Sequence, residues 1–132
     1  MNYLKFDEET MQLIEVEKYE NETTLEFLYS VLNCTLVNKV SCTNEIDIWV
    51  DDESLNTGNY NMIHTITNKK FSKSEPFILV GNLIFGSYNS EGDTIPLNVE
   101  QMKYVKENIY IESVSATEYL AKINSNNYND GI

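Results

Sequence analysis

The stretch Phe77-Ile-Leu-Val-Gly-Asn-Leu-Ile-Phe-Gly-Ser-Tyr88 contains no charged residue and is rich in branched and aromatic side chains. Because its apolar residues occupy both odd and even positions, it is typical of a strand that is buried on both faces of a sheet. Gly81 leaves room for another backbone to approach closely, and Gly86 suits a bulge or the end of the strand. We therefore expect residues 78–85 to form the central strand, with a neighbouring strand on each side.

Three further segments are predicted to contribute strands. Residues 3–6 and 11–19 favour a hairpin around an acidic turn, because polar and apolar residues alternate in the second of them. Residues 45–51 alternate strictly between an apolar and a polar face. The apolar face consists of Ile46, Ile48 and Val50, and the polar face consists of Asp47, Trp49 and Asp51. This strand is predicted to bury one face and to display acids around the only tryptophan on the other.

Capping signals mark two helices. Thr23 and Glu26 form a capping box in front of a stripe of apolar residues, and Asn98 with Gln101 forms the second box. Residues 113–123 favour a third helix, because their apolar side chains fall roughly on one side.

The composition is that of a globular protein. The chain has 132 residues, of which 42% are hydrophobic and 11% aromatic. We expect one α+β domain over residues 1–123, followed by a frayed polar tail over residues 124–132. The domain is expected to contain a mixed or mainly antiparallel sheet, with two to three helices packed mainly on one face.

The charge balance limits the classes of partner. Twenty-one acidic residues against nine basic ones give a net charge of −12, and all nine bases are lysine. Arginine supplies the bidentate contacts that usually grip phosphates and guanine edges. We therefore expect no direct binding to nucleic acid and none to an anionic membrane. The N-terminal residues 1–9 lack a basic region followed by an apolar core, so we expect no signal peptide and a cytoplasmic location.

The order of elements resembles that of a small domain family of unknown function, common in phages, plasmids and conjugative elements of Gram-positive bacteria. The resemblance rests on the segments Ile46-Asp-Ile-Trp-Val-Asp-Asp-Glu53, Leu79-Val-Gly-Asn-Leu-Ile-Phe85, Glu91-Gly92 and Leu97-x-x-Glu-Gln101. The chain departs from the pattern at Ser54, where the family has glycine, in the insertion up to Phe71 and after Ile111. The resemblance implies an α+β fold and a mobile-element setting, and it implies no active site.

The densest group of acids lies at the end of the predicted strand 45–51. With the tryptophan, these residues form the predicted partner-binding site: Asp47, Trp49, Asp51, Asp52 and Glu53. Paired carboxylates can also bind a divalent metal, but no second segment offers further ligands and the calcium-loop spacing is absent. A solvated acidic turn without a partner is the plain alternative.

The remaining residues that could support catalysis do not form a motif. His64 is the only histidine and lies among apolar and hydroxyl residues that complete no known catalytic pattern. Cys34 and Cys42 are too few for a disulfide scaffold or a four-ligand zinc site, so we expect buried free thiols. No enzymatic activity, catalytic residue, cofactor or bound metal is therefore expected.

Three functions fit these expectations. The first is a non-enzymatic counter-defence inhibitor of the anti-CRISPR or anti-restriction type. It would bind a basic host defence protein, such as a nuclease, by acidic mimicry of DNA. The second is a sponge that sequesters a nucleotide immune signal at an oligomer interface, and a homo-oligomer is compatible with the sequence. The third is an immunity protein that neutralises a co-encoded toxin.

Overall fold

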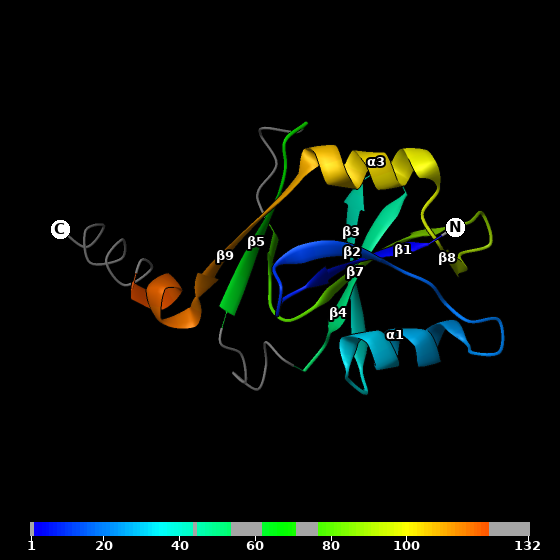
Figure 1. Cartoon of the computed structure of the whole chain (residues 1–132), viewed down its shortest axis with the longest axis horizontal. Helices are drawn as coiled ribbons and strands as arrows, with labels where there is room; N and C mark the ends of the chain where they lie inside the picture. Colours follow the sequence, from blue (N-terminus) through cyan, green and yellow to red (C-terminus); the bar gives the residue numbers. More distant parts are fainter. Residues whose placement is uncertain (1, 44, 54–61, 71–76, 122–132) are drawn as a thin grey trace.

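The computed structural model describes residues 2–43, 45–53, 62–70 and 77–121, which form two antiparallel sheets and flanking helices (Figure 1). The strands of the first sheet are β1 (Tyr3–Asp7), β2 (Gln12–Val16), β3 (Val37–Thr43), β4 (Ile46–Asp51), β7 (Leu83–Tyr88) and β8 (Thr94–Ile95). The strands of the second sheet are β5 (Met62–Asn68), β6 (Phe77–Leu79) and β9 (Ile109–Ser115). The helices are α1 (Thr24–Leu32) and α3 (Val99–Asn108), and residues 116–121 are also helical. The predicted α+β class with antiparallel sheets is confirmed.

Strand β7 lies at the centre of the first sheet. The strand order is β2-β1-β7-β4-β3, with β8 paired to the end of β7, and the second sheet has the order β6-β5-β9. Leu83, Ile84 and Phe85 are all 0% exposed. Leu83 and Phe85 face one side of the sheet and Ile84 faces the other. This half of the quoted stretch is the doubly buried central strand that the sequence predicted.

The other half of the stretch does not belong to that strand. β6 is one of the two outer strands of the second sheet, and Ile78 in it is 44% exposed. The chain leaves it at Gly81, whose φ of +79° is a conformation that glycine adopts without strain. The prediction of one continuous strand over residues 78–85 was therefore wrong, because apolar periodicity does not reveal a change of sheet. The close approach occurs at Gly86 instead, where an added Cβ would lie 3.0 Å from the Tyr3 ring.

The helices cover opposite faces of the first sheet, which corrects the expected packing mainly on one face (Figure 1). One cluster joins α1 to one face of the sheet. Its buried members are Phe27, Leu28 and Leu32 from α1, and Tyr3 and Ile84 from the sheet. Residues of α3 and of the second sheet share the main core with the other face, including Leu4, Phe6, Ile48, Phe85, Ile66 and Val105. The reason is β7 itself, since a strand that is apolar on both faces requires cover on both.

Both predicted capping boxes are present. The Thr23 hydroxyl accepts from the Glu26 backbone N–H at 3.1 Å, and the Glu26 carboxylate accepts in return from the Thr23 N–H. Asn98 and Gln101 make the same reciprocal pair at the start of α3. These bonds satisfy N–H groups that have no partner inside the helix, and they fix where each helix begins.

The C-terminal part differs from the prediction of a helix over residues 113–123. Residues 113–115 complete β9, which pairs along its length with β5, and helical structure begins only at residue 116. The β-branched residues Ile109, Ile111 and Val114 favour the strand, and the competing helical spacing is short. The predicted tail over residues 124–132 lies outside the described residues, and the single-domain boundary at residue 123 stays a prediction.

Replacing Leu83 by alanine should lower the free energy of unfolding by about 2–5 kcal/mol, because the side chain is fully buried and leaves a cavity. Urea denaturation followed by circular dichroism measures the change. Ile78→Ala, from the same apolar stretch but on the exposed outer strand, is the matched control and should cost about 1 kcal/mol or less. Equal midpoints for Leu83→Ala and the unaltered chain would contradict the central position of β7.

Candidate functional site

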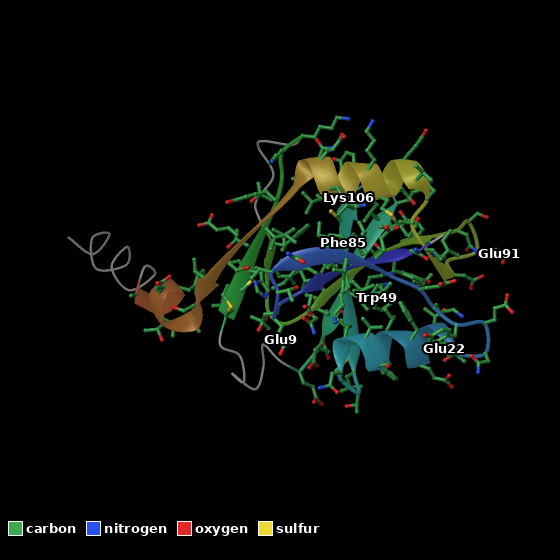
Figure 2. The ribbon with its side chains drawn as sticks, in the orientation of Figure 1. Glu9, Glu22, Trp49, Phe85, Glu91 and Lys106 are labelled. Atoms are coloured by element: carbon green, nitrogen blue, oxygen red, sulfur yellow. The ribbon has the colours of Figure 1, made fainter. Side chains whose placement is uncertain are left out.

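Two of the five predicted partner-binding residues are wholly or partly withdrawn from the surface. The Asp47 side chain is buried, and its carboxylate lies 3.8 Å from the Lys39 ammonium. Trp49 is half-buried and packs against the cluster of α1, with the Lys39 ammonium 5.9 Å from its ring centroid (Figure 2). Trp49 therefore belongs to the contact between sheet and helix, and a partner that touches only the surface does not reach the Asp47 carboxylate.

The other three predicted residues lie at the surface where β4 ends. Asp51 is half-buried, while Asp52 and Glu53 are exposed. The Asp51 carboxylate accepts from the Glu53 backbone N–H at 3.0 Å, and the Asp52 N–H donates to the Leu36 carbonyl at 3.0 Å. These bonds hold a tight acidic turn at the surface.

Asp51 also lines a surface groove with acids that are distant in the sequence. The turn between β1 and β2 contributes Asp7, Glu8 and Glu9 to the same groove. The remaining lining residues are Leu32, Asn33, Met62, Gly81 and Asn82, and the volume is about 470 Å³. None of these described lining residues is basic. We call this the acidic groove. Its N-terminal acids were not among the predicted site residues, because three acids in a turn usually mark nothing more than solvent exposure.

Local bonds hold the β1–β2 turn in place. The Thr10 hydroxyl donates to the Asp7 carboxylate at 2.8 Å, and the Lys5 ammonium lies 3.4 Å from the same group. The hydrogen bond from Thr10 and the charge of Lys5 hold the pKa of Asp7 below its usual value, so this acid stays ionised. The Asn82 side chain accepts from the Glu8 backbone N–H at 2.8 Å, which ties the turn to the segment between β6 and β7.

Glu8 is held by the only histidine. Nε2 of His64 lies 2.8 Å from the Glu8 carboxylate, and Nδ1 lies 2.7 Å from the Ser113 hydroxyl. The imidazole is 0% exposed and meets the Phe6 ring edge-on, with the ring centroids 5.0 Å apart. Ser113 stands directly opposite His64 in the β5–β9 pair. The chain Glu8–His64–Ser113 thus joins the turn of the first sheet to two strands of the second.

An acid, an imidazole and a hydroxyl in a row are the components of a serine hydrolase triad. A nucleophile must also be open to substrate, and neither Ser113 nor His64 lines the acidic groove. The imidazole is sealed inside the protein. The arrangement supports a structural role, in which His64 pairs a partly buried carboxylate and so positions the turn that bears Glu9.

The described residues provide no group of three or more His, Cys, Asp or Glu side chains arranged to hold a metal ion. Cys34 and Cys42 are free thiols, as predicted, and each is half-buried rather than fully buried. Burial, with the charge of Asp47 as the second cause, raises the pKa of Cys42 to about 11. Burial also raises the pKa of Cys34, with the charge of Asp51 adding to it. Both thiols are therefore poor nucleophiles.

Comparison with known protein families identifies the family of this chain. A family model described as a domain of unknown function (DUF3846) matches residues 1–110. No curated protein and no solved structure matches the chain. Within the described residues, no helix is both long and apolar enough to cross a membrane.

Replacing His64 by glutamine should lower the free energy of unfolding by about 1–3 kcal/mol, because the amide cannot span both Glu8 and Ser113 and leaves a buried polar group unpaired. A double-mutant cycle with Glu8→Gln isolates the pair, and the two changes should be clearly non-additive. Any binding activity should fall only as far as stability does. A variant with unchanged stability and lost activity would instead give His64 a chemical role.

Alkylation of Cys42 by iodoacetamide at pH 8 should be about a hundredfold slower than that of a free cysteine, because only the thiolate reacts and a pKa of about 11 leaves very little of it. Mass spectrometry of the modified peptides measures the two rates. The chain unfolded in urea is the control, and there both cysteines should react at the rate of free thiols. Fast alkylation of Cys42 in the folded chain would show that the thiol is neither shielded nor opposed by Asp47.

Proposed function

Because the chain belongs to the DUF3846 family of unknown function, its activity has to be inferred from its own surface, and we propose that it acts by binding a basic protein. The observation that supports this most directly is the acidic groove. Acids from the β1–β2 turn and from the end of β4 lie more than forty residues apart in the chain, and they line one hollow. The fold thus brings together acidic residues that are far apart in the sequence.

The electrostatics favour a cationic partner. The net charge is −12, and the acidic groove has four carboxylates among its lining residues, with Asp52 and Glu53 next in sequence to Asp51. A hollow lined by charges of one sign focuses the field and raises the rate of encounter with the opposite charge. Complementary charge also sets the orientation in which the partner docks.

The proposed partner is a nucleic-acid-targeting defence protein of the host, bound at its basic groove. The mobile-element setting implied by the resemblance supports an inhibitor of the anti-CRISPR or anti-restriction type. DNA presents one charge per roughly 1.7 Å of axis, so a mimic has to concentrate its carboxylates. The acidic groove, with Asp52 and Glu53, brings six acids to one end of the first sheet, and this concentration supports mimicry although Asp7 and Glu8 also contact Lys5 and His64.

The two alternatives have less support. A nucleotide sponge needs groups that bind phosphate, and the N-termini of α1 and α3, where an anion could bind, have Glu26 and Glu100 in their first turns. Those carboxylates repel an anion. An immunity protein for a co-encoded toxin would use the same acidic surface on a different basic partner, so the binding chemistry proposed here is common to both.

Substituting Asp51, Asp52 and Glu53 together by Asn, Asn and Gln should slow association with the partner about tenfold at low salt and change dissociation less. The Asp51→Asn side chain retains an oxygen that can accept from the Glu53 N–H, so the turn should survive. The measurement mixes the purified protein with purified candidate nucleases and follows association between about 0.05 M and 0.5 M salt, where screening removes most of the steering.

The matched control replaces Glu20, Glu91 and Glu107 by Gln, which gives the same net charge with exposed acids away from the groove. In Figure 2, Glu91 lies at the opposite end of the sheet from Glu9. This variant should associate nearly as fast as the unaltered chain. A parallel titration uses cyclic and ADP-ribose-type nucleotides. Tight nucleotide binding, with no protein complex at any salt concentration, would overturn the proposal in favour of the sponge.

A further inference from the structure

A second groove lies between the outer strands of the two sheets. β3 ends the strand order of the first sheet and β6 begins that of the second, and among the described residues no strand pairs with the outer side of either. The residues that line the space between them are Asn38, Val40, Val50, Asp51, Asp52, Ile78, Leu79 and Val80, and the volume is about 220 Å³. We call this the edge groove. It is the open side of the main core, since Val50 belongs to that core and Val40 packs against it.

The hydrogen-bond pattern of β3 shows which backbone groups face outward. The Asp52 N–H donates to the Leu36 carbonyl, and the register pairs residues 38 and 50 and residues 40 and 48. In an antiparallel pair, bonded and non-bonded positions alternate. Residues 36, 38 and 40 therefore bond to β4, and the N–H and C=O groups of Val37, Lys39 and Ser41 point away from it. The side chain of Asn38 accepts from the Lys39 N–H at 2.9 Å, a local bond that an added strand would replace.

The groove has the surface of a peptide site. Its floor is apolar, formed by Val40, Val50 and Leu79, and Ile78 is 44% exposed although it is large and apolar. An extended peptide that joins a sheet edge gains main-chain hydrogen bonds, and it places alternate side chains in such hollows. The β3 strand has seven residues and β6 has three, so β3 offers the longer edge.

The charge of the groove indicates the chemistry of the occupant. Asp51 and Asp52 line one end of it. The only base of β3, Lys39, lies on the opposite face of the sheet, where it contacts Asp47 and Trp49. The groove is thus lined by acids and apolar groups, with no base among its described lining residues.

We propose that the edge groove docks an extended segment of the partner protein that pairs with residues 37–41 of β3. In this segment, apolar side chains enter the groove at alternate positions, and a lysine or arginine that follows them on the same face reaches Asp51 and Asp52 at the end of the groove. The pairing ends at Ser41, because a bulge follows between Ser41 and Thr43. The inference rests on the proposed function, as it names the kind of segment that a basic partner supplies. Asp51 lines both grooves, so the two contacts are continuous.

The test uses the synthetic peptide Lys-Thr-Val-Thr-Val-Thr-Lys, whose lysines and valines lie on one face of an extended strand, and the same peptide with glutamate in place of each lysine. Backbone amide resonances of the full chain are followed by NMR as each peptide is added. The lysine peptide should shift the amides of Val37, Lys39 and Ser41, and the glutamate peptide should shift none of them. Shifts confined to Glu8 and Glu9 would overturn the edge groove as the docking site and leave the acidic groove, and with it the proposed function, in place.

Two lysine substitutions distinguish an effect of the edge groove on peptide binding from an effect of net charge. Ile78→Lys puts a base in the edge groove, and Ile14→Lys puts one on β2, the outer strand at the opposite edge of the first sheet. The two isoleucines are 44% and 38% exposed, so both variants should fold. Ile78→Lys should weaken binding of the lysine peptide about tenfold, because like charges meet, and Ile14→Lys should leave it nearly unchanged. Equal weakening would overturn the inference, as would failure of the lysine peptide to bind while a basic protein still binds in a salt-dependent way.

Discussion

The double burial of β7 is the constraint on which the rest of the structure depends. Three consecutive side chains, Leu83, Ile84 and Phe85, are removed completely from water, and they point alternately to the two faces of the first sheet. Each face then needs its own cover. Helix α1 supplies one, and α3 with the second sheet supplies the other (Figure 1). β1, from the N-terminal hairpin, pairs with one side of β7, and β4 pairs with the other. The backbone N–H and C=O groups of β7 therefore keep their hydrogen bonds although they lie in the core.

Local signals in the sequence predict local structure well. The capping boxes at Thr23 and Asn98 and the alternation in β4 indicate the elements that the structure contains, because the interactions that decide them lie within a few residues. The change of sheet at Gly81 escapes prediction for the opposite reason. The apolar residues on either side of it are equally suited to one strand or to two, and only contacts with distant strands decide between them.

The candidate site also combines a local feature that the sequence predicts with long-range contacts that it does not predict. The cluster from Asp51 to Glu53 was visible as a run of acids, but its partners in the groove come from the first ten residues of the chain. His64 appeared without a motif because Glu8 and Ser113 lie 56 and 49 positions away from it. Asp47 shares the polar side of β4, and still it is buried, since alternation assigns a residue to a face and does not tell what covers that face. The fold determines which charged side chains come together, and the sequence alone shows only how many there are.

The position of Trp49 has a practical consequence. It is the only tryptophan of the chain, and it lies at the contact between the first sheet and α1, with an indole N–H that is buried and has no hydrogen-bond acceptor among the described residues. Its intrinsic fluorescence is therefore a reporter of that one contact. Emission should move to longer wavelengths when α1 leaves the sheet and water reaches the ring. Loss of α1 would then be seen separately from loss of α3, which contains tyrosine but no tryptophan.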